Sequence, residues 1–354
     1  MVTALFHHGS MELREVLLSL PSDRRPVEQF LQQQGLRLEE DVEYTVIAVE
    51  GEKIVGTGSL SGKVLKCIAV ESSLQGQGVA SRILSELVQE AFRRGRDHLF
   101  LFTRPENEKL FTPLGFTPVE RMEKEIVLLE NRPNGFVHYL VSLREHRVEK
   151  GVSGSAVVNC NPFTLGHRYL LEYAASHVST LHVFVVEEDR SVFPTEVRYR
   201  LVQEGTRDIK NLILHRGGPY IISSATFPSY FLKEASEGTR LYGRFDATIF
   251  GKRICPVLNI SRRFVGEEPY CPVTSLYNQC LREILPQYGV QVEVIPRLEK
   301  DGRAVSASTV RKLLIEERWE EVKALVPETT FEFLQSREAE PILDRLKKKP
   351  DSRH

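Results

Sequence analysis

The strongest constraint on the fold of this chain is the alternation of strand-like and helical segments through its second half. Apolar, strand-like runs are followed by amphipathic segments with helical spacing, one after another. The expected strands are 155–159, 181–187, 212–215, 247–250, 264–265 and 291–295, and the expected helices are 167–177, 196–207, 273–288 and 309–317. Such alternation is typical of a mainly parallel sheet covered by helices. We therefore predict an α/β domain over residues 151–335.

The first part of the chain has a different pattern and predicts a separate α+β domain over residues 1–147. We expect two paired strands that are joined by a Glu-Gly-Glu-Lys turn. The full set comprises helices at 12–20, 26–34 and 80–94, and strands at 44–49, 54–60, 64–70, 98–103, 126–130 and 136–140. A charged and then glycine-containing stretch at 144–154 indicates a linker. The charged tail, 336–354, is expected to fray.

Composition narrows the classes of partner. The chain has 47 Lys and Arg against 48 Asp and Glu, a formal net charge of −1. It therefore has no overall excess of positive charge that would attract nucleic acid or an anionic membrane. Its 5 cysteines form no CxxC pair, which favours reduced thiols. We see no signal peptide and no apolar run of the ~18 residues that a membrane helix needs. A cytoplasmic protein without nucleic-acid or membrane partners is therefore expected.

One candidate ligand site begins where the strand 155–159 ends. The segment 161–167, Asn-Pro-Phe-Thr-Leu-Gly-His, leads from this strand into a helix. Ligands of open α/β sheets bind beyond the carboxyl ends of strands, and a helix N-terminus there favours anions. Gly166 would let a phosphate approach the backbone, and His167 would donate to its oxygens. The alternative is that His167 only starts the helix and Thr164 caps it.

A second candidate lies at the start of the helix 309–317. Ser306, Ser308, Thr309 and Arg311 gather at this helix N-terminus. Hydroxyl groups and an arginine fork suit a triphosphate. The alternative is an ordinary Ser/Thr N-cap beside a surface arginine.

Together the two segments resemble the motifs of the nucleotidylyltransferase superfamily, (H/T)xGH and (I/V)S(S/A)(S/T)xxR. They occur in the expected order, about 140 residues apart. The resemblance implies a Rossmann-like domain in which His167 stabilises the α-phosphate region, with Thr164 and Arg311 as further catalytic residues. The ATP-binding residues that it implies are Asn161, Phe163, Thr164, Gly166, His167, Ser306, Ser308, Thr309 and Arg311.

The first domain carries a glycine-containing loop between a strand and the helix 80–94. The loop 75–80, Gln-Gly-Gln-Gly-Val-Ala, resembles the (Q/R)xxGx(G/A) motif of GNAT acetyltransferases, and Leu114-Gly115-Phe116 matches that family's usual ending. The resemblance implies a loop whose backbone amides hold the pyrophosphate of a CoA-like group. The implied contacts are Val70, Gln75, Gly76, Gln77, Gly78, Val79 and Ala80. Glu71 is a weak candidate for a general base, because a solvated loop residue is as good an interpretation.

The combination of the two domains resembles the citrate lyase ligases. The segments 222–231 and 264–269 support this resemblance, which covers roughly residues 1–330. It implies an acid–thiol ligase that uses ATP and Mg²⁺ to convert acetate into acetyl adenylate. The acetyl group would then pass to the thiol of a CoA-like prosthetic group on the acyl carrier subunit of citrate lyase, with release of AMP and pyrophosphate.

The sequence leaves three alternatives undecided. The Mg²⁺ ligands are unassigned: Asp246, Glu267 and Glu268 are candidates, but each could be structural. The chain could instead be a nucleotidylyltransferase of a small phosphate substrate with a regulatory GNAT-like domain. It could also be an acetyl-CoA-dependent N-acetyltransferase with a nucleotide-sensing domain.

Overall fold

The computed structural model describes residues 11–122, 124–188, 190–231, 235 and 237–349. The chain folds into two compact units, Met1–Gly135 and Phe136–His354. The boundary lies before the linker predicted at 144–154, because the helix α3 (Gly135–Arg144) packs within the second unit. There Phe136 contacts Tyr220 with ring centroids 4.6 Å apart, and the Tyr139 hydroxyl donates to the Arg216 carbonyl at 2.9 Å.

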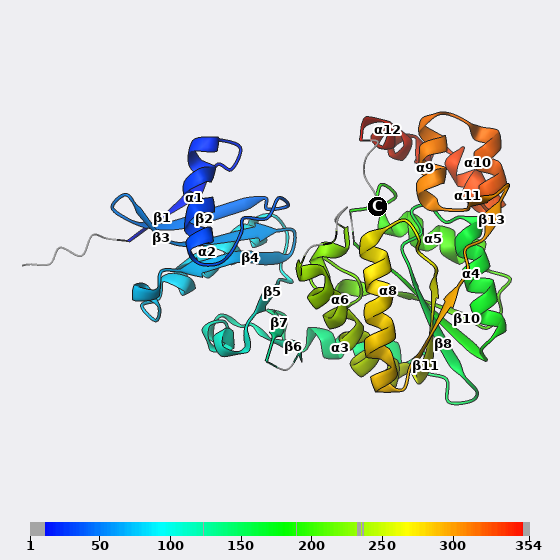
Figure 1. The fold of residues 1–354 in the computed structure, drawn as a ribbon, viewed down its shortest axis with the longest axis horizontal. Coiled ribbons are helices and arrows are strands. Elements are labelled where there is room, and N and C mark those ends of the chain that lie inside the picture. Colours follow the sequence, from blue (N-terminus) through cyan, green and yellow to red (C-terminus); the bar gives the residue numbers. More distant parts are fainter. Residues whose placement is uncertain (1–10, 123, 189, 232–234, 236, 350–354) are drawn as a thin grey trace, which may run out of the picture. The chain divides into compact units, whose positions relative to one another are not determined.

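The first unit is built on one mixed sheet of seven strands in the order β1-β2-β3-β4-β5-β7-β6 (Figure 1). Neighbouring strands are antiparallel except β4 and β5, which are parallel. The strands are β1 (Glu12–Val16), β2 (Tyr44–Glu50), β3 (Lys53–Ser61), β4 (Val64–Val70), β5 (Phe100–Thr103), β6 (Thr117–Met122) and β7 (Ile126–Glu130). The helices are α1 (Pro21–Gln33) and α2 (Val79–Arg93), with short 3₁₀ turns η1 (Ser72–Leu74), η2 (Pro105–Leu110) and η3 (Thr112–Leu114). The hairpin of β2 and β3 and the amphipathic helix α2 confirm the sequence prediction.

The second unit is a parallel sheet of five strands in the order β10-β9-β8-β11-β12. Figure 1 shows α4 and α5 on one side of this sheet and α6 and α8 on the other. The strands are β8 (Ser153–Val158), β9 (Thr180–Val185), β10 (Leu212–Arg216), β11 (Ile260–Gly266) and β12 (Gln291–Ile295). The chain leaves β8 toward β9 and later returns to its other side as β11, so the strand order reverses there. Ligands of such sheets bind in the crevice at this switch point.

Helices complete the second unit. They are α4 (Leu165–Ser176), α5 (Thr195–Gly205), α6 (Glu237–Ile249), α7 (Cys255–Leu258), α8 (Pro272–Ile284), α9 (Ala307–Ile315), α10 (Trp319–Leu325), α11 (Glu328–Leu334) and α12 (Glu340–Lys348). Shorter elements are η4 (Gly218–Tyr220), η5 (Pro228–Phe231), the π-helix η6 (Phe250–Ile254), η7 (Leu285–Tyr288), η8 (Arg337–Ala339), and the two-residue strands β13 (Glu299–Lys300) and β14 (Arg303–Ala304). In the described part of the chain, no helix has the length and apolar character needed to cross a bilayer.

Four secondary-structure predictions are wrong. The segment 12–20 begins with the strand β1, because pairing with β2 satisfies its backbone groups. The segments 136–140 and 247–250, predicted as strands, lie in helices α3 and α6–η6, since short buried apolar runs do not distinguish strand from helix. The tail does not fray over 337–349: Ile342 and Leu346, four residues apart on α12, are buried in the core of this unit.

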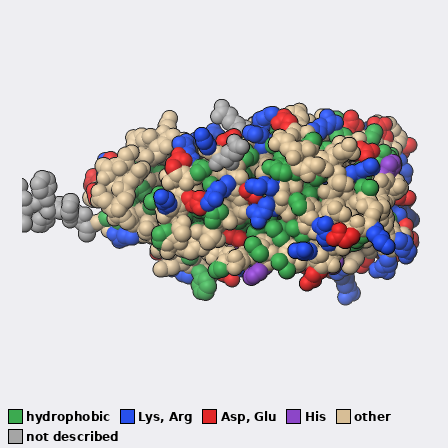
Figure 2. Space-filling view, turned by 90° about the horizontal axis from the view of Figure 1, so that it is seen from below, with side chains coloured by type: hydrophobic (Ala, Val, Ile, Leu, Met, Phe, Trp, Pro, Cys, Tyr) green, Lys and Arg blue, Asp and Glu red, His purple; other side chains and the backbone are tan. Residues whose placement is uncertain are grey.

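Charged side chains of both signs are interspersed over the face shown in Figure 2. This distribution agrees with the near-zero net charge of the sequence.

Candidate functional site

The first motif forms a capped helix start at the carboxyl edge of the second sheet. The chain leaves β8 at Val158 and enters α4 at Leu165, with Thr164 as the N-cap residue. The His167 backbone N–H donates to Thr164 Oγ1 at 3.4 Å, and the Thr164 backbone N–H donates to His167 Nδ1 at 3.0 Å. These reciprocal bonds are a capping box. The capping interpretation of Thr164 is therefore correct, and it also fixes the orientation of the His167 ring.

The His167 ring is held in one protonation state. Because Nδ1 accepts from the Thr164 backbone, the proton of the neutral ring resides on Nε2, which is then a hydrogen-bond donor. The pKa of His167 is lowered to about 4, chiefly by burial and in addition by the positive charges of Arg297 and Arg311. A neutral imidazole donor at a helix N-terminus can stabilise charge on a phosphate oxygen without giving up its proton.

We expect NMR to show that His167 stays neutral, with its proton on Nε2, at every pH between 5 and 8. The reason is the lowered pKa; an ordinary histidine would titrate near 6.5. The measurement is a ¹⁵N–¹H long-range correlation of the imidazole nitrogens across this range, with His167→Gln to assign the signal. Since the unfolded chain binds this proton below about 6.5 and the folded chain does not, His167 also makes folding less favourable as the pH falls toward 4. A midpoint near 6.5 for this ring would contradict the assigned state.

The second motif forms the start of α9. Ser306 is the N-cap residue, and its Oγ accepts from the Thr309 backbone N–H at 3.1 Å. The hydroxyls of Thr309 and Ser308 lie 2.9 and 3.3 Å from Ser306 Oγ. Three hydroxyl groups thus surround one helix N-terminus, where backbone N–H groups also favour an anion.

The structure joins the two motifs by direct contacts. Arg311 Nη1 donates to the Asn161 carbonyl at 2.7 Å. A Cβ on Gly166 would lie 2.5 Å from the Val305 carbonyl oxygen, so only glycine allows the α4 start to pack against the segment before α9. Close backbone packing is therefore a second reason for glycine at this position, beside the predicted approach of a phosphate. The two helix N-termini form one site at the switch point of the sheet.

Arg311 is not the surface residue of the alternative interpretation. Its side chain is buried, with 6% of the residue exposed, and burial lowers its pKa to about 10. The guanidinium still carries its charge at neutral pH, and little water surrounds it. A charge in such surroundings acts strongly on a neighbouring anion.

Two predicted ATP-binding side chains face the core instead. Phe163 is fully buried, and its ring occupies the space that a side chain on Gly205 would need. Asn161 is also buried, and its Oδ1 accepts from the Phe193 backbone N–H at 2.9 Å. Both side chains shape the loop between β8 and α4, and the Asn161 Nδ2 donor has no hydrogen-bond partner among the described residues.

Sequence reasoning missed Arg198 on α5, which is fully buried. Its guanidinium donates to backbone carbonyls of the loops that follow β8 and β9, at Asn159, Val186, Glu188 and Phe193, over 2.6–3.2 Å. It therefore holds the two loops that border the site. The available signal was its position: it precedes Leu201 and Val202 at helical spacing, on the apolar face of α5.

The candidate Mg²⁺ ligands are mostly engaged elsewhere. Both carboxylate oxygens of buried Asp246 accept hydrogen bonds, from the Ile222 N–H at 2.8 Å, Thr226 Oγ1 at 2.6 Å and the Tyr277 hydroxyl at 2.5 Å. Glu268 pairs with Arg297 and accepts from the Cys271 N–H at the start of α8. Both are structural, and the described residues hold no group of three His, Cys, Asp or Glu that suits a metal ion. Glu267 keeps an exposed side chain.

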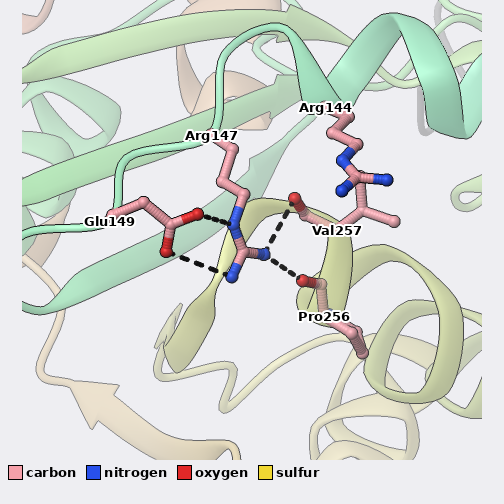
Figure 3. A pocket seen from close by; sticks show the side chains of 5 residues that line it. All are labelled: Arg144, Arg147, Glu149, Pro256 and Val257. Carbon is pink, nitrogen blue, oxygen red and sulfur yellow. Dashed lines mark hydrogen bonds and ion pairs between the residues drawn. The ribbon is translucent and has the colours of Figure 1, made fainter.

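A pocket of about 370 Å³ lies at the opposite edge of the sheet from the two motifs (Figure 3). Arg144, Arg147 and Glu149 line it before β8, and Pro256 and Val257 line it before β11. Arg147 donates to the carbonyls of Pro256 and Val257 and pairs with Glu149, so it caps the end of α7. This pocket lies at the amino ends of the strands, away from both motifs.

In the first unit, the loop 75–80 forms the N-terminal entry to α2. Gly76 and Gly78 have φ of +81° and +83°, a conformation that favours glycine, and the space beside each is open. The Gln77 side chain donates to the Ser73 carbonyl at 3.1 Å, and the Gln75 side chain to that of Val70 at 3.4 Å. The loop thus leaves open space beside two glycines just before the N-terminus of α2, and a helix N-terminus suits a phosphate.

The surroundings of this loop contain few groups for acid–base chemistry. Glu71 forms an ion pair with Lys53 at 2.6 Å, which favours the structural interpretation of Glu71. Phe111, three residues before Leu114-Gly115-Phe116, is buried and carries no ionisable group. β4 and β5 pair only at Val64–Phe100 and Leu65–Leu101, so the described strands separate as β4 runs toward the loop.

Comparisons with known proteins cover both units. Residues 153–334 match the family model described as citrate lyase ligase C-terminal domain, and residues 11–116 match the acetyltransferase (GNAT) family. The chain is 43% identical over 325 residues to a citrate (pro-3S)-lyase ligase of Klebsiella pneumoniae, covering 91% of this chain and 95% of that protein. Ligases of the same name from Haemophilus influenzae and Escherichia coli are 41% and 39% identical, covering 87% and 88% of this chain and 94% and 90% of theirs. Among solved structures, Escherichia coli ElaA is 13% identical with a TM-score of 0.32, covering 35% of this chain and 100% of its own.

Proposed function

The chain belongs to the citrate (pro-3S)-lyase ligase family, and on that premise we propose how its two units divide the reaction. The second unit uses ATP with Mg²⁺ to convert acetate into acetyl adenylate. The first unit holds the CoA-like arm of the citrate lyase acyl carrier subunit, whose thiol takes the acetyl group. We place this acid–thiol ligase in the cytoplasm, where thiols such as its five free cysteines stay reduced.

The single observation that carries the proposal is the junction of the two helix N-termini. An acetate oxygen attacks the α-phosphorus, the bond from that phosphorus to the bridging oxygen breaks, and pyrophosphate leaves. His167 Nε2–H donates to an α-phosphate oxygen as negative charge develops. The hydroxyls of Ser306, Ser308 and Thr309 and the charge of Arg311 hold the leaving pyrophosphate.

In the second half-reaction the carrier thiol gives its proton to water, and its sulfur attacks the acetyl carbon. The bond between that carbon and the adenylate oxygen breaks, and AMP leaves. Mg²⁺ would be bound mainly by phosphate oxygens of ATP and by waters that it retains, and it would offset the negative charge of the triphosphate. Glu267 is the candidate that could add a protein oxygen.

The proposal predicts acetate-dependent formation of AMP and of an acetylated carrier. The test incubates the purified protein with ATP, Mg²⁺, acetate and deacetylated carrier, and follows the carrier by mass spectrometry. Acetyl transfer from acetyl-CoA without ATP would favour an acetyltransferase instead. AMP transfer to a small phosphate compound would favour a nucleotidylyltransferase.

Arg311→Lys is expected to lower kcat/KM for ATP even though the positive charge is kept. A lysine carries its charge at one point and lacks the planar fork, so it cannot hold the Asn161 carbonyl and act on phosphate in the same geometry. Loss of one charge-assisted hydrogen bond costs about 1.5–3 kcal/mol, which is roughly ten- to hundredfold. Steady-state kinetics at several ATP concentrations measures it.

The matched control is Lys312→Arg, the reverse exchange at the next position of α9, which is exposed. It should leave the kinetics for ATP unchanged. An Arg311→Lys enzyme with unchanged kcat/KM for ATP would remove Arg311 from the site.

A further inference from the structure

Arg297 lies beside the candidate site, although no motif includes it. It follows the end of β12 and turns back to the neighbouring strand β11. Its Nε donates to the Glu267 carbonyl at 2.8 Å, and its Nη2 forms an ion pair with Glu268. Because β11 lies between β12 and β8, these contacts bring the guanidinium toward the strand that carries the first motif.

Backbone contacts place Arg297 close to the start of α4. The next residue, Leu298, accepts a hydrogen bond from the Val305 N–H at 2.9 Å. The Val305 carbonyl in turn packs against Gly166. An independent sign of proximity is that the charge of Arg297 helps to lower the pKa of His167. Arg297 and His167 thus border the same crevice.

The guanidinium of Arg297 is anchored on one side and available on the other. Its Nη1 has no hydrogen bond to any residue that the structure describes, and 24% of its side chain is exposed, against 12% for Glu268. An arginine held by a carbonyl and a carboxylate loses little conformational entropy when a ligand binds to its remaining N–H groups. If Arg297 only joined the ends of β11 and β12, it would not need exposed N–H groups that have no partner among the described residues.

The reaction brings two anions together at this crevice. The N-termini of α4 and α9 offer donors for the polyphosphate, so ATP has its own partners. Acetate must approach the negatively charged α-phosphate, and two like charges at bonding distance repel each other strongly where water is excluded. A cation on the β11 side of the crevice would offset this repulsion.

Resting on the function proposed above, we propose that Arg297 binds the carboxylate of acetate and positions it for attack on the α-phosphate. One carboxylate oxygen accepts from the free N–H groups of Arg297, and the other is left to form the bond to phosphorus. Glu268 holds the guanidinium in place.

The test compares Arg297→Gln and Arg297→Lys with the wild type in acetate-dependent ATP–pyrophosphate exchange. We expect KM for acetate to rise roughly ten- to hundredfold in Arg297→Gln, the usual cost of a lost hydrogen bond to a charged group, and less in Arg297→Lys. KM for ATP, and binding of a fluorescent ATP analogue without acetate, should stay within about twofold of the wild type.

The matched control is Arg216→Gln, which removes another ion-paired arginine at the carboxyl end of a strand of the same sheet. It should leave KM for acetate unchanged and lose a similar amount of thermal stability. If Arg297→Gln does not fold, Arg297→Lys provides the test: KM for acetate should rise relative to KM for ATP. Equal changes in both KM values, or a change in KM for ATP alone, would overturn the assignment to acetate. Absence of exchange in the wild type would instead contradict the proposed function itself.

Discussion

His167→Ala is expected to slow acetyl adenylate formation by roughly 10²–10³-fold, the usual effect of removing one pre-organised donor to a developing oxyanion. This corresponds to about 2.7–4 kcal/mol of transition-state stabilisation. The reason is that Nδ1 is committed to the Thr164 backbone, so the Nε2–H donor is fixed in direction. Acetate-dependent ATP–pyrophosphate exchange measures the loss.

The same substitution also removes one of the two hydrogen bonds of the capping box, that of His167 Nδ1, so its structural effect has to be separated. Loss of this bond alone costs roughly 1 kcal/mol of stability. His167→Gln keeps this contribution, because glutamine at the third helical position can accept from the N-cap N–H. We therefore expect His167→Gln to regain stability in thermal unfolding but not activity.

A second control uses His177, the exposed histidine at the other end of the same helix. His177→Ala should exchange at the wild-type rate. If His167→Ala also exchanged at the wild-type rate, the role of His167 would be structural alone.

Gly78→Glu is expected to impair acetyl transfer to the carrier while adenylate formation continues. A carboxylate at this position would stand where the loop offers N–H groups to a pyrophosphate, in space that is now open. Repulsion between like charges near 4 Å costs about 1–4 kcal/mol, depending on screening by water. We therefore expect a loss of roughly tenfold or more in kcat/KM for the carrier. Pyrophosphate release and carrier acetylation are followed in parallel on the full chain.

The matched control is Gly35→Glu, which follows α1 in the same unit. Gly35 has φ of +74° and open space beside it, so the control introduces the same charge and the same backbone strain away from the loop. It should leave both half-reactions intact. Equal loss of both activities in folded Gly78→Glu would contradict the division of labour, and normal carrier acetylation would refute the role of the loop in arm binding.

The boundary between the units decides where a fragment of the second unit should begin. A fragment that starts near Gly151 would lack α3, whose Phe136 and Leu143 are buried in the second unit. A fragment of the second unit should therefore begin before Gly135. The periodicity of 136–140 did not reveal this, since a five-residue apolar run fits a strand and a helix equally well.

The sequence by itself determined the features that depend on local patterns. Short-range spacing predicted the strand-to-helix turns at 161–167 and 75–80 and the N-caps at Thr164 and Ser306. The alternation of strands and helices predicted that the strands of the second sheet are parallel. These signals are local because each depends on residues within one or two turns of chain. They were sufficient to predict the fold class and both candidate loops.

Tertiary structure alone decided which of these residues meet. Three contacts join segments that are far apart in sequence. Arg311 reaches the Asn161 carbonyl, Gly166 packs on Val305, and Arg297 turns back onto β11. Burial is decided in the same way: Phe163 lies in the core and the tail helix α12 is packed, although the sequence predicted a nucleotide contact for Phe163 and a frayed tail. Local patterns determine what each segment can form, but a side chain's partners and exposure depend on where the rest of the chain folds against it.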